Sequence, residues 1–326
     1  MTSSNSASKQ KKRKAVPLAP PAMKSRKKAR QVTTQFHKLS RRRDAALQQG
    51  DQAQVATLDK AIEEMGGREQ YQRASQVSTS FHSTSKWVIG YLVRNGWIYG
   101  IPEEQDIGES RCQKKRKKRP TRLLEIGAIN TELLDAAKIN ETTLNGSADE
   151  ITKPKHSNSL QVRAIDLNAM DERIEEIDFL EMKIAKEKEN RYDVIVCSMV
   201  LNCVTTAERR GRMLCRIYHF LRPGGLCFLT IPKSCLTLSP CISREKFLTL
   251  LQTISFELVE FKESPKVSFF ICRRSVNELP ISEDKIAEWN ALAVTPPPRW
   301  TKRYQTDFSV VLPKVSVDDR NLVYEY

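Results

Sequence analysis

The chain has 326 residues and a formal net charge of +15 at pH 7, and 40% of its residues are hydrophobic. This length provides for one large domain or two modest ones with a real core. No segment reaches the roughly 20 apolar residues of a bilayer-spanning helix, and the Ser- and Lys-rich N-terminus is no secretory signal. The 8 cysteines contain no C-x-x-C pair, which argues against zinc and favours a reducing compartment. We therefore expect a soluble intracellular protein without a metal.

The positive charge is concentrated in an N-terminal tail. Residues 1–50 carry 14 Lys and Arg against one Asp, whereas residues 120–326 carry 28 against 29 acids. Residues 1–31 have few large apolar groups, so we expect this basic tail to be disordered. Its clusters Lys11–Lys14 and Lys24–Lys28 have the spacing of a two-part nuclear localisation signal that importin reads. A solvated tail that binds nucleic acid without sequence preference is the alternative.

Residues 32–120 are predicted as a helical region followed by a basic linker. Helical spacing runs through residues 36–65, with a break at Gly50–Asp51 and a stop at Gly66–Gly67. A further helix is expected from Ser85, its N-cap, to Asn95–Gly96. The linker, residues 97–120, closes on a run of Lys and Arg that is either a solvated or localisation segment or a substrate contact.

Residues 121–274 alternate between strands and helices. We predict strands at 123–126, 160–165, 192–197 and 226–231, helices at 133–137, 208–221 and 243–254, and a charged helix that runs on to Glu189. Residues 256–261 and 266–272 form a terminal hairpin. The fold class is therefore α/β, a Rossmann-like doubly wound sheet that is mostly parallel with an antiparallel terminal hairpin. Residues 275–326 are a C-terminal extension with a short apolar run at Phe308–Leu312, and the sequence leaves open whether it packs on the core.

Two strands of this pattern end on side chains suited to a nucleoside. The run Leu123–Ile126 contains the acid Glu125 and leads to Gly127, and the next predicted strand ends on Asp166. An open α/β sheet binds a nucleoside with backbone at such a glycine turn and with a carboxylate on the ribose hydroxyls. The sequence therefore predicts a nucleotide-like cofactor.

The parallel sheet with its closing hairpin resembles the fold of S-adenosylmethionine-dependent methyltransferases. The block Tyr71–Ser75 before a Ser-Lys-Trp helix, together with Leu123–Ile129 and Ile177–Leu180, resembles the fungal 25S ribosomal RNA adenine-N1 methyltransferase family. Metazoan relatives of that family are S-adenosylmethionine sensors in nutrient signalling. The common methyltransferase turn has three glycines, and here Ile129 and Thr131 occupy the second and third positions.

The resemblance implies a set of cofactor-binding residues. Gly127 would let the main chain approach the methionine portion, and Asp166 would accept the ribose hydroxyls. Asp178 and Phe179 resemble the pair that reads the adenine, and Arg73 would pair with the cofactor carboxylate. Each has a structural alternative: Gly127 is a simple turn glycine, and Asp166 is a solvated carboxylate or a helix cap. Asp178 is a helix cap followed by a core Phe at position 179, and Arg73 is an ordinary surface residue.

Two residues after the strand at 192–197 are weaker catalytic candidates. Ser198 faces the predicted site, because ligands bind outside the carboxyl ends of the strands, and it is also expected among the cofactor-binding residues. Asn202 would hydrogen-bond a substrate base. A strand-end hydroxyl and a polar helix-start residue are the alternatives. Asp193, at the beginning of the same strand, is interpreted as structural.

The function that the resemblance implies is methylation of an adenine N1 in large-subunit ribosomal RNA, in the nucleus and nucleolus, on a pre-ribosomal particle. N1 carries a lone pair, so the reaction needs an in-line approach rather than a strong base. A non-catalytic S-adenosylmethionine sensor acting through a protein partner is the alternative from another class. Protein methylation is a third reading, because Leu-Arg-Pro-Gly-Gly occurs in many methyltransferases.

Overall fold

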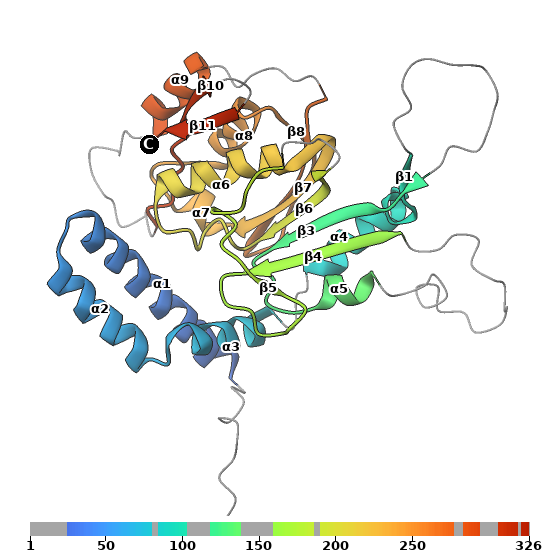
Figure 1. Ribbon diagram of the computed structural model, residues 1–326. Coiled ribbons are helices and arrows are strands. Elements are labelled where there is room, and N and C mark those ends of the chain that lie inside the picture. Colours follow the sequence, from blue (N-terminus) through green and yellow to red (C-terminus); the bar gives the residue numbers. More distant parts are fainter. Residues whose placement is uncertain are drawn as a thin grey trace, which may run out of the picture.

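One mixed sheet of seven strands organises the chain, in the order β5-β4-β3-β6-β7-β9-β8 (Figure 1). The computed structural model describes residues 25–79, 84–102, 118–137, 159–185, 190–276, 283–293, 306–318 and 321–325. The strands of the sheet are β3 (Thr121–Ile126), β4 (Leu160–Asp166), β5 (Glu175–Glu176), β6 (Tyr192–Ser198), β7 (Leu221–Pro232), β8 (Phe256–Glu263) and β9 (Val267–Arg274).

The strand directions confirm the predicted Rossmann-like fold. Strands β3 to β7 pair in parallel, and β9 runs antiparallel to both β7 and β8. In the central strand β6, every residue from Tyr192 to Cys197 is buried. Its β-branched residues suit a strand that is covered on both faces. Alternate side chains along the strands therefore pack into two separate layers.

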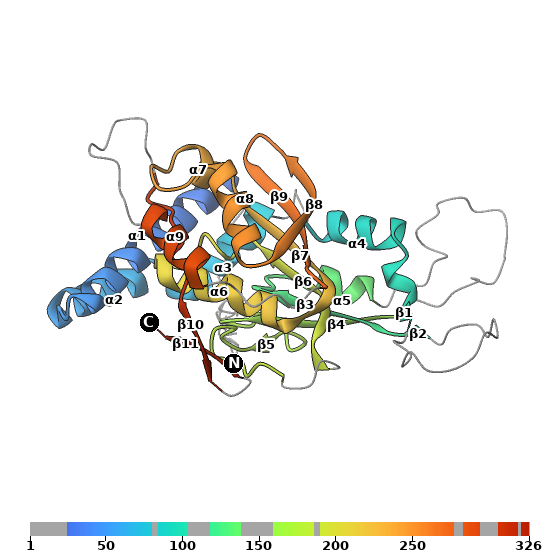
Figure 2. The same cartoon turned by 90° about the horizontal axis from the view of Figure 1, so that it is seen from above.

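Helices cover both faces of the sheet (Figure 2). On one face Leu123 and Val194 join Val88 and Leu92 of α4 (Thr84–Arg94), near α5 (Glu132–Ala136) and η1 (Trp97–Tyr99). On the other face Leu124 packs in the cluster that includes α6 (Ala207–Phe220), α8 (Arg244–Thr253) and α9 (Glu283–Ala293). The short α7 (Ser234–Thr237) follows β7. None of the described helices combines the length and apolar character needed to cross a lipid bilayer.

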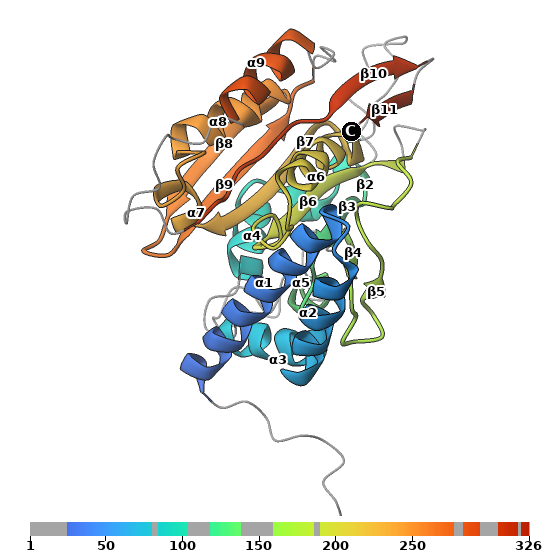
Figure 3. The ribbon, with the colours of Figure 1, turned by 90° about the vertical axis from the view of Figure 1, so that its left-hand side faces the viewer.

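Three N-terminal helices form a bundle beside the sheet (Figure 3). They are α1 (Arg26–Gln48), α2 (Gln52–Glu64) and α3 (Gly67–Thr79), so the predicted break at Gly50–Asp51 is confirmed. Asp51 caps α2 by accepting from the Gln54 N–H at 3.0 Å. The prediction of disorder is wrong for residues 26–31, which begin α1. Ser25 caps that helix, and Ala29 is fully buried.

Two further predictions of local structure need correction. Ser85 lies inside α4, which begins at Thr84. The charged helix expected up to Glu189 is absent from Glu181 to Ala185 in the described part of the segment. Arg212 donates to the Leu180 carbonyl at 3.0 Å and Arg216 donates to that of Met182. These side chains from α6 bind carbonyl groups that a helix would use itself.

The polar insert at 140–158, the basic residues 114–117 and the Pro-rich residues 296–300 lie outside the described residues. The ends of the predicted linker are ordered as the antiparallel pair β1 (Ile101–Pro102) and β2 (Lys118–Arg119).

The basic run ends in an ion pair at the start of the sheet. Arg119 makes two hydrogen bonds of 2.6 Å to the carboxylate of Asp193, which is 2% exposed. The same carboxylate accepts from the Arg122 N–H at 2.9 Å. A two-pronged arginine pair of this kind fixes both position and orientation. The interpretation of Asp193 as a structural residue is confirmed.

The C-terminal segment packs on α6, which settles a question that the sequence leaves open. Phe308, Val310 and Leu312 are buried in the main core. The Val311 N–H donates to the Ala207 carbonyl at 3.0 Å, and Trp289 Nε1 donates to the Val310 carbonyl at 3.0 Å. The hairpin β10 (Lys314–Asp318) and β11 (Asn321–Glu325) follows.

Gly211 in α6 is the position where this packing is least tolerant. An added Cβ would lie 1.8 Å from the Val311 carbonyl oxygen. We expect Gly211→Ala to displace the segment and to lower the free energy of unfolding by about 1–3 kcal/mol. Urea unfolding measures the difference. Gly90→Ala in α4 is the matched control, because its Cβ meets only Arg94 Nη1 at 3.4 Å. Equal losses in the two variants would contradict the prediction.

Candidate functional site

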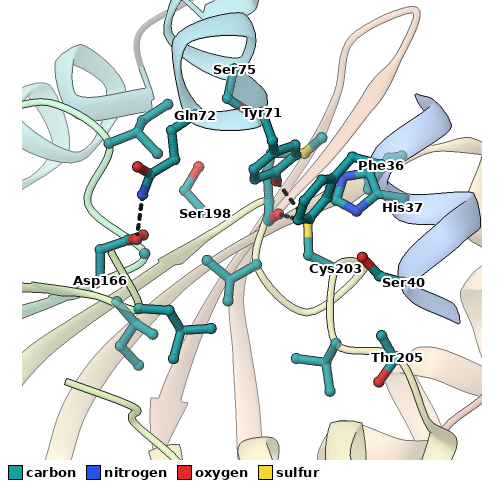
Figure 4. Close-up of a pocket in the computed structure, with 18 of the residues that line it drawn as sticks. Phe36, His37, Ser40, Tyr71, Gln72, Ser75, Asp166, Ser198, Cys203 and Thr205 are labelled. Atoms are coloured by element: carbon teal, nitrogen blue, oxygen red, sulfur yellow. Dashed lines mark hydrogen bonds between the residues drawn. The ribbon is translucent and has the colours of Figure 1, made fainter. Parts of the chain in front are cut away.

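A cavity of about 1840 Å³ lies at the carboxyl ends of the parallel strands (Figure 4). Its floor comes from the ends of β3, β4 and β6, and α1 and α3 contribute side chains to its wall. In a doubly wound sheet this edge is the usual ligand site, at the point where strand order reverses. Here the reversal falls between β3 and β6.

Gly127 lines the cavity, and the turn itself demands a glycine. Its φ is +73°, and an added Cβ would lie 2.4 Å from Val200 Cγ2. The Gly127 N–H donates to the Ile165 carbonyl at 2.8 Å. The close contact is thus with the loop after β6, so the glycine requirement follows from packing and from backbone conformation.

Asp166 lines the cavity at the end of β4 and is held from two sides. Its Oδ1 accepts from Gln72 Nε2 at 2.7 Å and from the Asn168 N–H at 2.8 Å. Gln72 Oε1 accepts in turn from Asn168 Nδ2 at 2.7 Å. Burial raises the pKa of Asp166, although the bonds from Asn168 and Gln72 act in the opposite direction. The sequence points to Asp166, whereas within the Tyr71–Ser75 block it singles out Arg73 and not Gln72.

Glu125 is a functional candidate that the cofactor-residue prediction leaves out. It is 8% exposed, lines the cavity, and has a buried Oε2 without a hydrogen-bond partner among the described residues. Burial raises the pKa of Glu125 to about 8, and the Glu132 carboxylate adds to the shift. A buried, unpaired acid is costly when ionised, so this wall favours a cationic ligand. An acid near the end of an apolar strand is the signal that points to it.

Asp178 and Phe179 both line the cavity, and each also has a structural partner. Asp178 Oδ1 accepts from the Leu180 N–H at 2.8 Å, as a turn cap does, and Asp178 lies 3.6 Å from Arg209. Phe179 is 3% exposed and packs against Phe220 with ring centroids 5.1 Å apart. Asp178 is therefore a turn cap and Phe179 a core residue, and both also line the cavity.

Ser198 joins three elements at the cavity floor. Its hydroxyl donates to Thr84 Oγ1 at 2.9 Å and lies 3.0 Å from Thr230 Oγ1. Met199, the next residue, has a positive φ of 59°, which is rare for a residue with a side chain. Its N–H donates to the Thr230 carbonyl at 2.9 Å. Ser198 thus ties α4 to β7 at a strained strand end, and strain of this kind is frequent at functional sites.

Two predicted residues do not line the cavity. Arg73 donates to Glu69 one turn earlier in α3, so the structure gives it a partner other than a cofactor. Asn202 donates through Nδ2 to Cys203 Sγ at 3.4 Å, and its buried Oδ1 has no hydrogen-bond partner in the described residues.

An aromatic group from the N-terminal helices also lines the cavity: Phe36, His37 and Tyr71, with Cys203 beside them. Phe36 and Tyr71 stack with centroids 4.4 Å apart at 19°. Burial lowers the pKa of His37 to about 4, with Arg41 adding to the effect, so its imidazole is neutral at pH 7. Helical spacing assigns Phe36 to an apolar face and says nothing of a cavity. Within the described residues, no group of three or more His, Cys, Asp or Glu could hold a metal ion.

The strand order, the reversed β9 and the acid at the end of β4 define the fold of an S-adenosylmethionine-dependent methyltransferase. The sequence model of one family within this class, described as Bmt2: 25S rRNA (adenine(2142)-N(1))-methyltransferase, matches residues 56–292. The chain belongs to this family.

A curated relative is the 25S rRNA (adenine(2142)-N(1))-methyltransferase of Saccharomyces cerevisiae, which is 30% identical over 99 residues. The match spans 30% of this chain and 29% of the relative's length.

Similar solved structures include two N-methyltransferases. The 1,6-didemethyltoxoflavin-N1-methyltransferase of Burkholderia thailandensis is 16% identical, with a TM-score of 0.33. The match covers 48% of this chain and 72% of that chain. NodS from Bradyrhizobium japonicum is 15% identical, with a TM-score of 0.32 over 48% and 79%.

Glu125 makes stability depend on pH. Its pKa rises from an ordinary 4.5 to about 8 on folding, so between these values the folded state binds more protons than the unfolded state. Its contribution to stability therefore falls as pH rises through this window, by about 1.4 kcal/mol per pKa unit. Urea unfolding at a series of pH values should show this slope in the wild type and a flatter one in Glu125→Gln. Identical slopes would contradict the assignment.

Proposed function

We propose that this protein transfers a methyl group from S-adenosylmethionine to N1 of an adenine in 25S ribosomal RNA. The observation that carries the proposal is the family match over residues 56–292. This range contains α3 and all seven strands of the sheet, and so most of the cavity wall. When bound, S-adenosylmethionine supplies an electrophilic methyl group on a positively charged sulfur.

The cavity residues fit this cofactor in charge and in hydrogen bonding. The unpaired Oε2 of Glu125 is an acceptor for the cofactor's α-ammonium group. Asp166 would accept from the ribose hydroxyls, with Gln72 keeping its carboxylate in place. The turn at Gly127 would lie along the methionine portion, and Asp178 and Phe179 would border the adenine. Ser198 stays a weaker candidate, because its hydroxyl is already engaged.

The adenine N1 is itself the nucleophile, so the protein's task is to place it and exclude water. Proximity and orientation account for a large part of such a rate enhancement. N1 lies on the Watson–Crick edge, and extruding a paired base costs roughly a few kcal/mol. Contacts to the RNA backbone would offset that penalty.

Basic side chains suited to phosphate contacts surround the acidic interior. Arg30, Arg68, Lys262 and Lys266 are exposed and line the cavity. The basic tail would add contacts of the same kind, which position RNA without reading its sequence. We also propose nuclear and nucleolar work on a pre-ribosomal particle, with importin reading the tail. Of the two clusters, Lys11–Lys14 lies outside the described residues, and Arg26–Lys28 are helical.

Cofactor binding tests the assignment of Asp166 and Gln72. We expect Asp166→Ala to abolish measurable S-adenosylmethionine binding, and Gln72→Ala to weaken it about tenfold by releasing the carboxylate. Isothermal titration calorimetry measures both. Arg73→Ala, the next residue on α3, is the matched control and should bind as the wild type does. Unchanged affinity in Asp166→Ala would remove the ribose assignment.

Nucleoside analysis separates an enzyme from a sensor. Deletion of the gene should remove one 1-methyladenosine from 25S rRNA, as measured by mass spectrometry of its nucleosides. The wild-type protein should restore it, and the Asp166→Ala protein should not. An undiminished 1-methyladenosine content, with cofactor binding intact, would instead favour a non-catalytic S-adenosylmethionine sensor.

A further inference from the structure

The proposed cofactor contacts involve only part of the cavity wall. Gly127, Asp166 and Phe179 lie at or beyond the ends of β3, β4 and β5, all on one side of β6 in the sheet. The cavity volume of about 1840 Å³ exceeds the roughly 300–1,000 Å³ of a typical small-molecule pocket. A second ligand can therefore lie beside the cofactor, toward the loop that follows β6.

The wall of that region is aromatic and rigidly held. Phe36 stacks on the Tyr71 ring at 4.4 Å, and His37 contacts that ring edge-on at 5.0 Å. Its hydroxyl lies 3.7 Å from Cys203 Sγ, in the loop after β6, and that sulfur donates to the Met199 carbonyl at 3.1 Å. Tyr71 directly precedes Gln72, whose bond to Asp166 fixes α3 over the sheet. The ring orientation is therefore set before any ligand arrives.

We propose that Phe36 and Tyr71 form the stacking platform for the methyl-accepting adenine. This rests on the proposed function and specifies where its base substrate binds. Proteins hold an unstacked base mainly against aromatic side chains. The adenine extends the Phe36–Tyr71 stack into the cavity, over the loop that follows Ser198. Tyr71 then contacts the reacting base, and Phe36 supports the Tyr71 ring from its other face.

The same rings suit the charge that the reaction places on the base. The N1 lone pair forms the new N–C bond as the C–S bond breaks, and the electron pair of that bond stays on sulfur. The positive charge thus moves from sulfur to the adenine, and no proton has to leave the base in this step. Aromatic faces attract such a cation, and the neutral imidazole of His37 adds no opposing charge.

RNA binding without cofactor tests the platform directly. The probes are two stem–loop RNAs with the sequence around the family's target adenine, one intact and one abasic at that position. The wild type should bind the intact RNA about tenfold more tightly, the contribution of one stacked base. Tyr71→Leu should abolish this preference, and Tyr71→Phe should retain it. If Tyr71→Leu fails to fold, Phe36→Leu is the second variant. It leaves the Tyr71 hydroxyl in place and should also reduce the preference for the intact RNA.

An aromatic residue outside the platform shows whether the effect is specific to Tyr71. Trp87 in α4 also lines the cavity, with its ring edge-on to Phe228 and Phe269. Trp87→Leu should keep the preference for the intact RNA; if it abolishes the preference while Tyr71→Leu keeps it, the proposal is wrong.

Kinetics separate the platform from the proposed function. In Tyr71→Leu we expect kcat to fall about tenfold or more while the Kd of S-adenosylmethionine changes by less than about threefold. Wild-type methylation together with full activity in Tyr71→Leu overturns the platform alone. A wild type that neither methylates the intact RNA nor distinguishes it from the abasic one overturns the proposed function, and the platform with it.

Discussion

The hydrogen bond between Gln72 and Asp166 joins the helical bundle to the sheet, and the cavity depends on it. Asp166 ends a parallel strand, where a carboxylate is available to a ligand; Gln72 and Asn168 hold that carboxylate in one orientation. Because α3 is fixed there, Tyr71 reaches the loop after β6, and α1 follows through the stacked Phe36. The wall of the site is thus joined to its floor by a contact between residues 94 positions apart in sequence.

Burial separates the charges of the site into an acidic interior and a basic exterior. Glu125 and Asp166 lie at strand ends, where burial raises the pKa of both. Arg30, Arg68, Lys262 and Lys266 line the same cavity and are exposed. Such an arrangement favours a cationic ligand inside and a polyanion outside. It matches the two substrates proposed, a sulfonium cofactor and RNA, and each can bind without the other.

Six of the seven strands were predictable because each carries its own signal, whereas the two-residue β5 was not predicted. The buried run Tyr192–Cys197 and the hairpin strands near Phe256 and Cys272 have strand patterns that no neighbouring helix overrides. The helix prediction failed for the segment after Leu180, because Arg212 and Arg216 of α6 donate to the carbonyl groups of Leu180 and Met182. Local propensity carries no information about such donors.

The sequence alone determined the order of the long strands along the chain, the acids at the strand ends and the expectation of a nucleotide-like cofactor, because these follow from local periodicity and from the polarity of strand-end residues. Only the tertiary structure decided which residues share the cavity. It paired Arg73 with Glu69 and placed Gln72 on Asp166, although the two are neighbours on α3. Successive residues of a helix point about 100° apart. Which of them faces the site is therefore set by how α3 packs on the sheet.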